Sequence, residues 1–162
     1  MYYLSTDTHH SNQGHYTGTK KSIFLAGPSA RNSKIGTRWR CDVRQYLNNR
    51  SDLVLFIPEP TDLSNNPDTD IIPFWPSFDV QFEWEMHHLS IADIIMFWVP
   101  RKFPDYPAFT TNIEFGYHVT RHNLIYGRPD DAEKCQYLDF LWKRHHNAPI
   151  HGDLEYMCKL IR

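Results

Sequence analysis

The chain has 162 residues, of which 41% are hydrophobic and 22% are charged, a composition typical of a globular protein. Single domains cluster at ~100–150 residues, so one folded domain is expected. The formal net charge of −2 excludes a protein built mainly for electrostatic binding to a nucleic acid polymer, because such domains carry a clear basic excess. Aromatic residues make up 15%, more than a small core needs, so we expect some of them to line a pocket or an interface.

The first 21 residues are rich in Ser, Thr, His and Gly, and they are predicted to form a flexible tail before a domain over residues 22–162. They lack the order of basic and then apolar residues that defines a signal peptide. The strongest apolar run, Ile94–Val99, is far shorter than the ~20 residues that a bilayer requires, so no membrane partner is expected. Three widely spaced cysteines without a Cys-x-x-Cys pair fit a reduced compartment, and the expected location is the cytoplasm.

From Ser22 onward, short β-rich apolar runs alternate with helical patterns, which predicts a parallel α/β sheet. The expected strands, in chain order, are Ile23–Ala26, Leu53–Ile57, Asp93–Val99 and Asn123–Tyr126. The expected helices are Thr37–Leu47, Ser77–Ile91, one that begins at Asn112 as its N-cap, one from about Asp130 to about His145, and Gly152–Ile161.

Long loops follow the first three predicted strands, and they span Gly27–Gly36, Pro58–Pro76 and Pro100–Thr111. Connections of this length are unusual in such folds, where 2–6 residues are common. Open α/β sheets bind ligands outside the carboxyl ends of their strands. The sequence therefore predicts a binding site at this edge of the sheet.

Glu114 is the first acidic candidate at that edge, in the first turn of the helix predicted to begin at Asn112. The helix dipole and the exposed amides there favour an ionised carboxyl group. An oriented carboxylate is what a nucleophile at a sugar carbon requires. Acids are also common in first turns for dipole reasons alone, so a purely structural role is equally open.

Glu85 is the second acidic candidate. On a helix through Ser77–Ile91, the apolar side chains at positions 78, 82, 86 and 89 form one stripe, and Glu85 lies within it. A carboxyl group facing the core loses solvation, which raises its pKa and suits it to act as a general acid. The alternative is a partly buried glutamate paired with a basic residue.

Two carboxyl groups, one charged and one protonated, form the pattern used to cleave a bond to an anomeric carbon. An alternative is a metal site, because Glu114, His118 and His122 could share one helix face. No His-Glu-x-x-His motif or Cys/His cluster supports it, so neither a metal nor any other cofactor is expected.

Seven segments, in this order and at this spacing, resemble the nucleoside 2-deoxyribosyltransferase-like family, and the resemblance covers roughly Ser22–Asp139. The segments are Ser22–Pro28, Trp39–Arg40, Ile57–Pro60, Gln81–Glu85, Ala92–Pro100, Thr110–Gly116 and Tyr126–Asp130. Each segment alone is weakly specific, whereas the ordered set is fairly specific.

The resemblance implies a flavodoxin-like three-layer sandwich with a mostly parallel sheet of four to five strands. It also implies cleavage of the N-glycosidic bond of 2′-deoxynucleosides or their 5′-monophosphates and transfer of the deoxyribosyl group to another base. Glu114 matches the nucleophile that forms a covalent glycosyl intermediate. Glu85 matches the residue that handles the proton of the leaving base, although the family usually has Asp there. The resemblance further implies a homo-oligomer.

The remaining predicted substrate contacts lie within or near these segments. They are Gly27, Pro28, Arg40, Glu59, Trp75, Asp93, Thr110, Thr111 and Asn112. Arg40 could bind a 5′-phosphate, and Trp75 could stack on a nucleobase. Typical transferases hold the sugar hydroxyls with acidic residues before the nucleophile, and here Thr110, Thr111 or Asn112 would substitute.

Two other functions stay open at this point. A nucleotide N-glycosidase would use the same nucleophile with water as the acceptor, and the basic residues of the first loop favour a phosphorylated substrate. A non-catalytic nucleotide-binding relative would have kept only the fold, and the presence of both Glu85 and Glu114 speaks against it.

Overall fold

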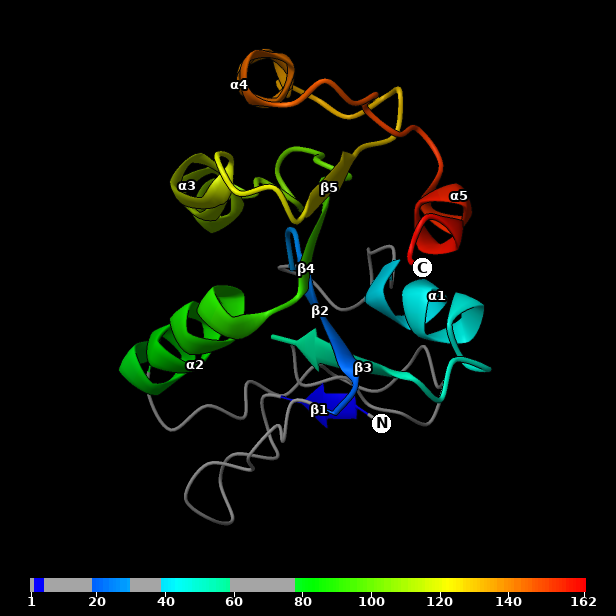
Figure 1. Ribbon diagram of the computed structural model, residues 1–162. Coiled ribbons are helices and arrows are strands. Elements are labelled where there is room, and N and C mark those ends of the chain that lie inside the picture. The colour runs from blue at the N-terminus through cyan, green and yellow to red at the C-terminus, as the bar shows by residue number, and fades with distance from the viewer. Residues whose placement is uncertain (1, 5–18, 30–38, 59–77) are drawn as a thin grey trace.

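The structure is a computed structural model that describes residues 2–4, 19–29, 39–58 and 78–162 (Figure 1). Five strands form one parallel sheet in the order β1-β3-β2-β4-β5. The strands are β1 (Tyr2–Leu4), β2 (Lys21–Ala26), β3 (Leu53–Ile57), β4 (Ile94–Trp98) and β5 (Leu124–Gly127). The helices are α1 (Trp39–Tyr46), α2 (Phe78–Ile91), α3 (Phe109–His118), α4 (Gln136–His145) and α5 (Leu154–Lys159).

The order β3-β2-β4-β5 is that of a flavodoxin-like sheet, and β1 extends it beyond β3. The predicted fold class is therefore confirmed. β2 is central, since Ile23 pairs with Leu55 of β3 on one side and with Ile94 of β4 on the other. The chain passes from β2 through α1 to β3 on one side, and then from β3 through α2 to β4 on the other side of β2. This reversal places a topological switch point at the carboxyl end of β2, where such folds bind ligands.

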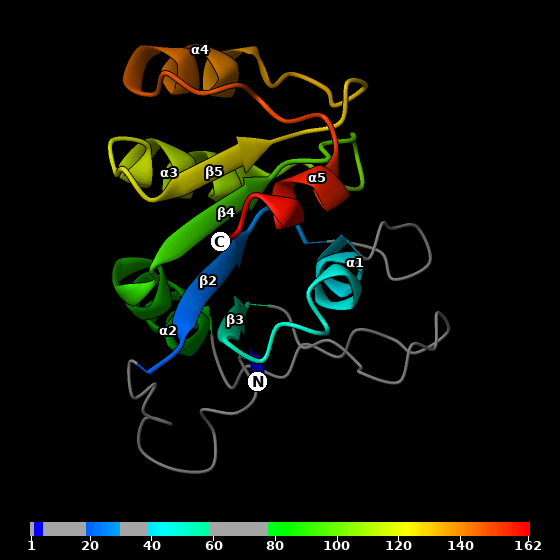
Figure 2. The same ribbon diagram turned by 45° about the vertical axis from the view of Figure 1, so that its right-hand side comes forward.

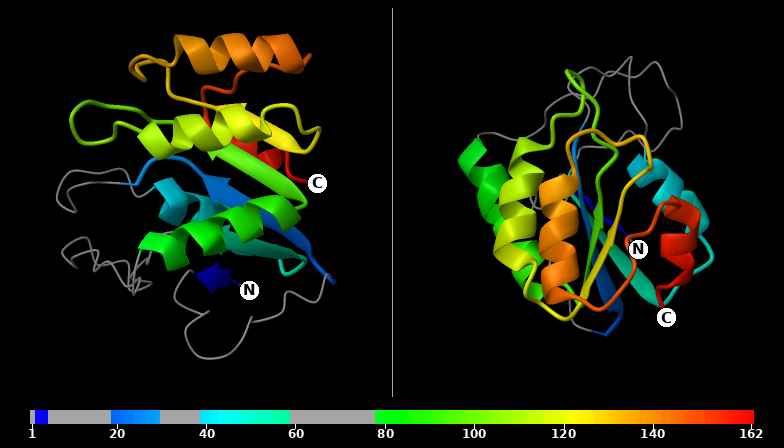
Figure 3. Two further views of the ribbon diagram at one scale, coloured as in Figure 1. Left: turned by 90° about the vertical axis from the view of Figure 1, so that its left-hand side faces the viewer. Right: turned by 90° about the horizontal axis from the view of Figure 1, so that it is seen from above.

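Helices cover both faces of the sheet (Figure 3). α2, α3 and α4 lie on one face, and α1 and α5 lie together in front of the other (Figure 2). Along β2, Phe24 and Ala26 pack in the cluster under α2, α3 and α4, whereas Ile23 and Leu25 pack with α1 and α5. A strand buried on both faces reads as a continuous apolar run, which is why the sequence indicates the central strands so clearly.

The N-terminal segment differs from the prediction. Tyr2–Leu4 forms the edge strand β1, in register with residues 55–57 of β3, and Lys21 already belongs to β2. Residues 2–4 therefore pair with the sheet, residues 5–18 lie outside the described residues, and the boundary between tail and domain stays a prediction. The prediction relied on average composition, whereas a three-residue edge strand needs only β-favouring side chains and a neighbour with unpaired backbone groups.

The buried face of α2 also differs from the prediction. Phe78 and Met86, expected in the apolar stripe, are 75% and 61% exposed, and the helix buries Trp84 and His88 together with Leu89, the one member of the stripe that is buried. Apolar residues occur on both sides of this helix, so their spacing alone does not identify the side that meets the sheet.

Two helices begin at positions other than predicted. α3 begins at Phe109, because Ala108 adopts a left-handed conformation (φ 56°) that starts the helix earlier than Asn112. α4 begins at Gln136 and not near Asp130, since residues 130–135 form turns. None of the helices in the described part of the chain has the length and apolarity needed to span a bilayer.

Candidate active site

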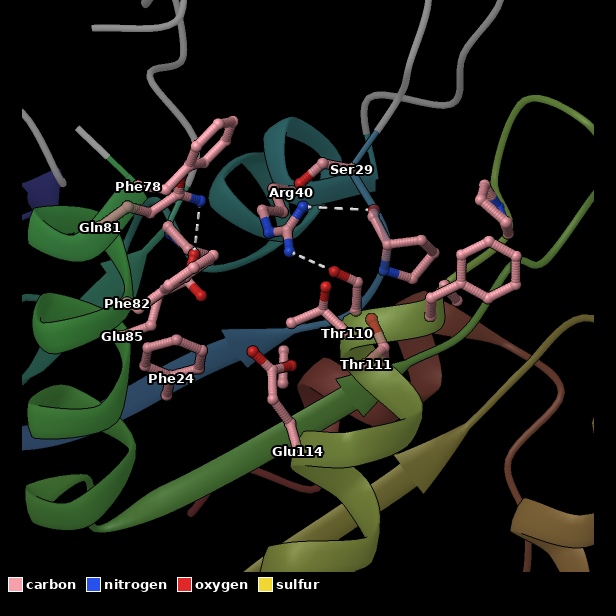
Figure 4. A pocket seen from close by; sticks show the side chains of 17 residues that line it. Phe24, Ser29, Arg40, Phe78, Gln81, Phe82, Glu85, Thr110, Thr111 and Glu114 are labelled. Carbon is pink, nitrogen blue, oxygen red and sulfur yellow. Dashed lines mark hydrogen bonds between the residues drawn. The ribbon is translucent and has the colours of Figure 1, made fainter. Parts of the chain in front are cut away.

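A cavity of about 330 Å³ opens at the carboxyl end of β2, between α2 and the start of α3 (Figure 4). Its volume lies within the ~300–1,000 Å³ range of small-molecule sites. The described residues that line it are Phe24, Ala26, Gly27, Pro28, Ser29, Arg40, Pro58, Phe78, Gln81, Phe82, Glu85, Pro107, Ala108, Phe109, Thr110, Thr111 and Glu114. The cavity thus occupies the sheet edge that the sequence predicts.

Gly27 allows the chain to turn away from β2 beside this cavity. Its φ of +155° is a conformation that residues with side chains rarely adopt. A Cβ atom here would overlap the carbonyl oxygen of Trp98 and would lie 2.8 Å from the Trp39 ring. Only glycine therefore fits where the loop after β2 passes the end of β4.

Arg40 fixes the same loop from α1. Its side chain is 2% exposed, and the guanidinium donates hydrogen bonds to the carbonyl oxygens of Leu25 (3.1 Å), Gly27 (2.7 Å) and Pro28 (3.4 Å). It also lies 4.3 Å from the centre of the Trp39 ring. These contacts give Arg40 a structural role that the sequence did not reveal, and binding of a 5′-phosphate by Arg40 stays a prediction.

The start of α3 supplies Thr110, Thr111 and Glu114 to the cavity, and Figure 4 shows all three side chains pointing into it. Because α3 begins at Phe109, Glu114 lies in its second turn, beyond the exposed amides of the first. The predicted stabilisation of an ionised Glu114 by a helix start is therefore wrong.

Glu85 faces the cavity from α2 and is only 8% exposed. One turn earlier on the same helix, Gln81 donates a hydrogen bond of 2.7 Å from its Nε2 to Oε1 of Glu85 (Figure 4). The burial of Glu85 agrees with the prediction, although the apolar stripe from which it was inferred does not exist.

The two acids influence each other across the cavity. The pKa of Glu114 is raised from 4.5 to about 7; burial is the largest cause, the negative charge of Glu85 adds to it, and Arg40 opposes both effects. Two neighbouring carboxyl groups in a poorly solvated site cannot both ionise easily. The proton that the pair holds at lower pH is therefore half lost at pH 7, and the two groups titrate together.

Four phenylalanines form an aromatic wall of the cavity that the sequence analysis, which expected aromatic residues in a pocket, did not identify. Phe24, Phe78 and Phe82 lie on the side of Glu85, and the rings of Phe78 and Phe82 stack with their centres 6.0 Å apart. Phe109 lines the opposite side from α3. The spacing of Phe78 and Phe82 was visible, but it was assigned to the core rather than to the cavity.

Two predicted substrate contacts lie elsewhere. Asp93 precedes β4 at the amino edge of the sheet, where Oδ2 accepts hydrogen bonds from the backbone N–H (2.7 Å) and the hydroxyl (2.8 Å) of Ser22. Asn112 accepts a hydrogen bond from Arg101 and is absent from the cavity wall. Both predictions are corrected, because each side chain joins two segments of the fold. Glu59 and Trp75 lie outside the described residues.

His88 lies one turn after Glu85 as a neutral core residue. Its Nδ1 donates to the carbonyl oxygen of Trp84 (2.8 Å), and its ring stacks on that indole at 4.0 Å. Burial lowers its pKa from 6.5 to about 4. Within the part of the chain that the structure describes, no three His, Cys, Asp or Glu side chains gather as metal ligands would.

Comparisons with known proteins agree with this geometry. The sequence model of one protein family, described as nucleoside 2-deoxyribosyltransferase like, matches residues 20–132. The matched segment runs from the start of β2 to the turn after β5, so it contains the whole described wall of the cavity. A search of the curated proteins finds no match.

Proposed function

The chain belongs to the nucleoside 2-deoxyribosyltransferase-like family, and from this premise we propose that it cleaves the N-glycosidic bond of a 2′-deoxynucleoside or its 5′-monophosphate and transfers the deoxyribosyl group to another base. The observation that carries the proposal is a pair of electrostatically coupled acids, buried Glu85 from α2 and partly exposed Glu114 from α3, in a cavity at the switch point of the sheet.

In the proposed reaction, a carboxylate oxygen of Glu114 attacks C1′ while the bond from C1′ to the base nitrogen breaks. The electron pair of that bond leaves with the base, which takes its proton from Glu85. The resulting sugar ester of Glu114 is then attacked at C1′ by a second base, which returns a proton to Glu85. Two displacements of this kind retain the configuration at C1′.

The distribution of side chains supports a division of the cavity. The aromatic rings of Phe24, Phe78 and Phe82 lie near Glu85, and stacking on such rings is worth ~1–3 kcal/mol per base in other proteins. Thr110 and Thr111 offer hydroxyl groups near Glu114, where the sugar would lie. The base therefore fits the α2 side and the sugar fits the α3 side.

The test is to incubate the protein with each deoxynucleoside and deoxynucleotide, with and without a second free base, and to identify the products by mass. The proposal expects a new nucleoside that contains the second base. Formation of free deoxyribose or its phosphate alone, unaffected by added base, would identify the N-glycosidase alternative. No cleavage of any substrate would refute both and favour a binding role.

We expect kcat/KM for cleavage to follow a bell-shaped pH profile whose alkaline limb has an apparent pKa near 7. The active form needs an ionised Glu114 and a proton on Glu85, which together amount to one proton on the pair. Raising the pH through about 7 removes this last proton. Initial rates between pH 4 and 9 measure the profile, and activity that instead rises through pH 7 would show that Glu114 acts without a proton donor.

We also propose that a second copy of this chain packs against the exposed apolar side chains of α2 and α3, three of which (Phe78, Phe82 and Phe109) also line the cavity. Three side chains one turn apart are exposed on each helix; they are Phe78, Phe82 and Met86 on α2, and Phe109, Ile113 and Tyr117 on α3, all 46–75% exposed. At ~200 Å² per large side chain, they present about 800 Å², which is close to what one partner buries in a stable interface. Gly116 flanks the α3 stripe with open space at its Cβ position, so a partner can approach closely there.

Replacing Tyr117 by serine in this surface is expected to convert a dimer into a monomer at micromolar concentration, because it removes a large apolar contact. Sedimentation velocity measures the change. Tyr156→Ser is the matched control, since Tyr156 is 53% exposed on α5, on the other face of the sheet. A wild-type protein that sediments as a monomer would contradict the proposed interface.

A further inference from the structure

Gln81 and Glu85 form a side-chain pair within the cavity wall. They lie one turn apart on α2, and the hydrogen bond of 2.7 Å from Nε2 of Gln81 to Oε1 of Glu85 is drawn in Figure 4. Glu85 is almost completely buried, whereas Gln81 is partly exposed to the cavity. The Gln81–Glu85 pair therefore lies between the open cavity and the side of α2 that packs against the core.

The chemistry of the two groups makes this contact directional. A primary amide nitrogen can only donate, and an ionised carboxylate can only accept. The N–H of Gln81 therefore favours the charged form of Glu85, because a protonated Glu85 offers it only a neutral, weaker carbonyl acceptor. A hydrogen bond to a charged group is also about twice as strong as one between neutral groups.

We propose that Gln81 is a positioning residue for Glu85: its carboxamide N–H fixes the orientation of the Glu85 carboxylate and, in the empty cavity, leaves the proton that the two acids share on Glu114. When a substrate binds, Glu114 loses this proton and becomes the nucleophile. Glu85 then receives the proton and is ready to donate it to the leaving base. The role of Glu85 as proton donor rests on the proposed function, whereas the resting position of the proton does not.

The other titratable groups around the pair act differently. Arg40 on α1 lowers the pKa of Glu114 and so favours its ionised form, in opposition to Gln81. His88, on α2 one turn from Glu85, and His118, on α3 one turn from Glu114, both have pKa values lowered by burial. They are therefore neutral near pH 7. The contact that favours a charged Glu85, and so a proton on Glu114, is the hydrogen bond from Gln81.

The experiment measures the position of the proton without any substrate. The side-chain carboxyl carbons of glutamate are labelled with ¹³C, the signals are assigned with Glu85→Gln and Glu114→Gln, and both are followed by NMR from pH 3 to pH 9. In the wild type, the titration step near pH 7 is expected almost entirely on the Glu114 signal. In Gln81→Met, which keeps the length and helix propensity of the side chain but has no donor, the share of this step on Glu85 should increase about tenfold relative to Glu114.

Two further variants make the result specific. Gln81→Lys restores a donor at the same position, so the step near pH 7 should return to the Glu114 signal. Gln45→Met is the matched control, because Gln45 is exposed on α1, and it should leave both signals as in the wild type. An unchanged division of the step in Gln81→Met would overturn the inference. If no substrate is ever cleaved, the proposed function fails, but this titration still decides where the proton rests.

Discussion

Glu114→Gln is expected to lower kcat by at least ~10⁴-fold, on the scale seen when the nucleophile of a covalent mechanism is removed. Glutamine has nearly the same shape as glutamate, so the cavity should keep its geometry while C1′ loses the atom that attacks it. Rapid-quench trapping of a deoxyribosyl ester on the wild-type protein, and its absence in the variant, checks the same step directly. A variant with near-normal kcat would exclude Glu114 as the nucleophile.

The same substitution is expected to stabilise the fold at alkaline pH. Since burial raises the pKa of Glu114 from 4.5 to about 7, the folded state binds more protons than the unfolded state between these values. The contribution of Glu114 to stability is therefore complete below pH 4.5 and is lost as the pH rises through 7. At 1.36 kcal/mol per pKa unit, the loss amounts to about 3 kcal/mol, and the partial exposure of Glu114 makes this an upper value.

Urea unfolding at pH 4 and at pH 8 measures this effect. The free energy of unfolding of Glu114→Gln, relative to the wild type, should rise by up to ~3 kcal/mol between the two pH values. Neutral, buried His88 contributes with the opposite sign, because its stabilisation is present above pH 6.5 and is lost as the pH falls through about 4. That contribution is common to both proteins and cancels. Glu83→Gln, at an exposed position on α2, is the control and should change neither kcat nor this difference.

Glu85→Gln is expected to lower kcat by ~10²–10⁴-fold for bases that leave poorly, which is the range that a general acid contributes. The new carboxamide oxygen can still accept the hydrogen bond from Gln81, so orientation is kept while the transferable proton is lost. A deoxyriboside whose leaving group departs as a stable anion, such as nitrophenolate, should lose far less activity. Equal losses for good and poor leaving groups would argue against an acid role.

The pH profile gives a second measure of the same variant. With position 85 uncharged, the pKa of Glu114 should fall, because the charge of Glu85 is one cause of its elevation. The alkaline limb near pH 7 should also disappear, since no proton remains to be lost from Glu85. The residual activity of Glu85→Gln should therefore be flat above pH 7, whereas that of Glu83→Gln should follow the wild type.

The local pattern of the sequence was sufficient for the central strands. Leu53–Ile57 is found with its predicted bounds, and the other predicted strands are displaced by at most two residues at either end. Each is a short apolar run buried on both faces, so its signal does not depend on knowing which face meets which helix. The alternation of these runs with helices also determined the parallel architecture and the edge at which the cavity opens.

The assignment of helix faces required the tertiary structure. On α2, the apolar side chains of Phe78 and Phe82 could have faced the sheet, but the helix is rotated so that Trp84 and Leu89 do. The start of α3 likewise follows a left-handed conformation at Ala108, which alanine does not favour. Packing against the sheet decides which side of α2 is buried and where α3 begins. The position of the sheet relative to each helix cannot be read from a single sequence.

By itself, the sequence determined the alternation of β2–β5 with helices and the edge that carries the cavity, because these follow from periodicity. It also named Glu85 and Glu114 as the two acids to examine, although the apolar stripe that pointed to Glu85 does not exist. Only the tertiary structure decided the electrostatics. In the fold, Glu114 lies beyond the first turn of α3 and its pKa is raised. Gln81 donates a hydrogen bond to Glu85, and Asp93 lies at the opposite edge of the sheet. Burial and charge act through distance in space, and residues far apart in the chain set that distance only once the sheet has formed.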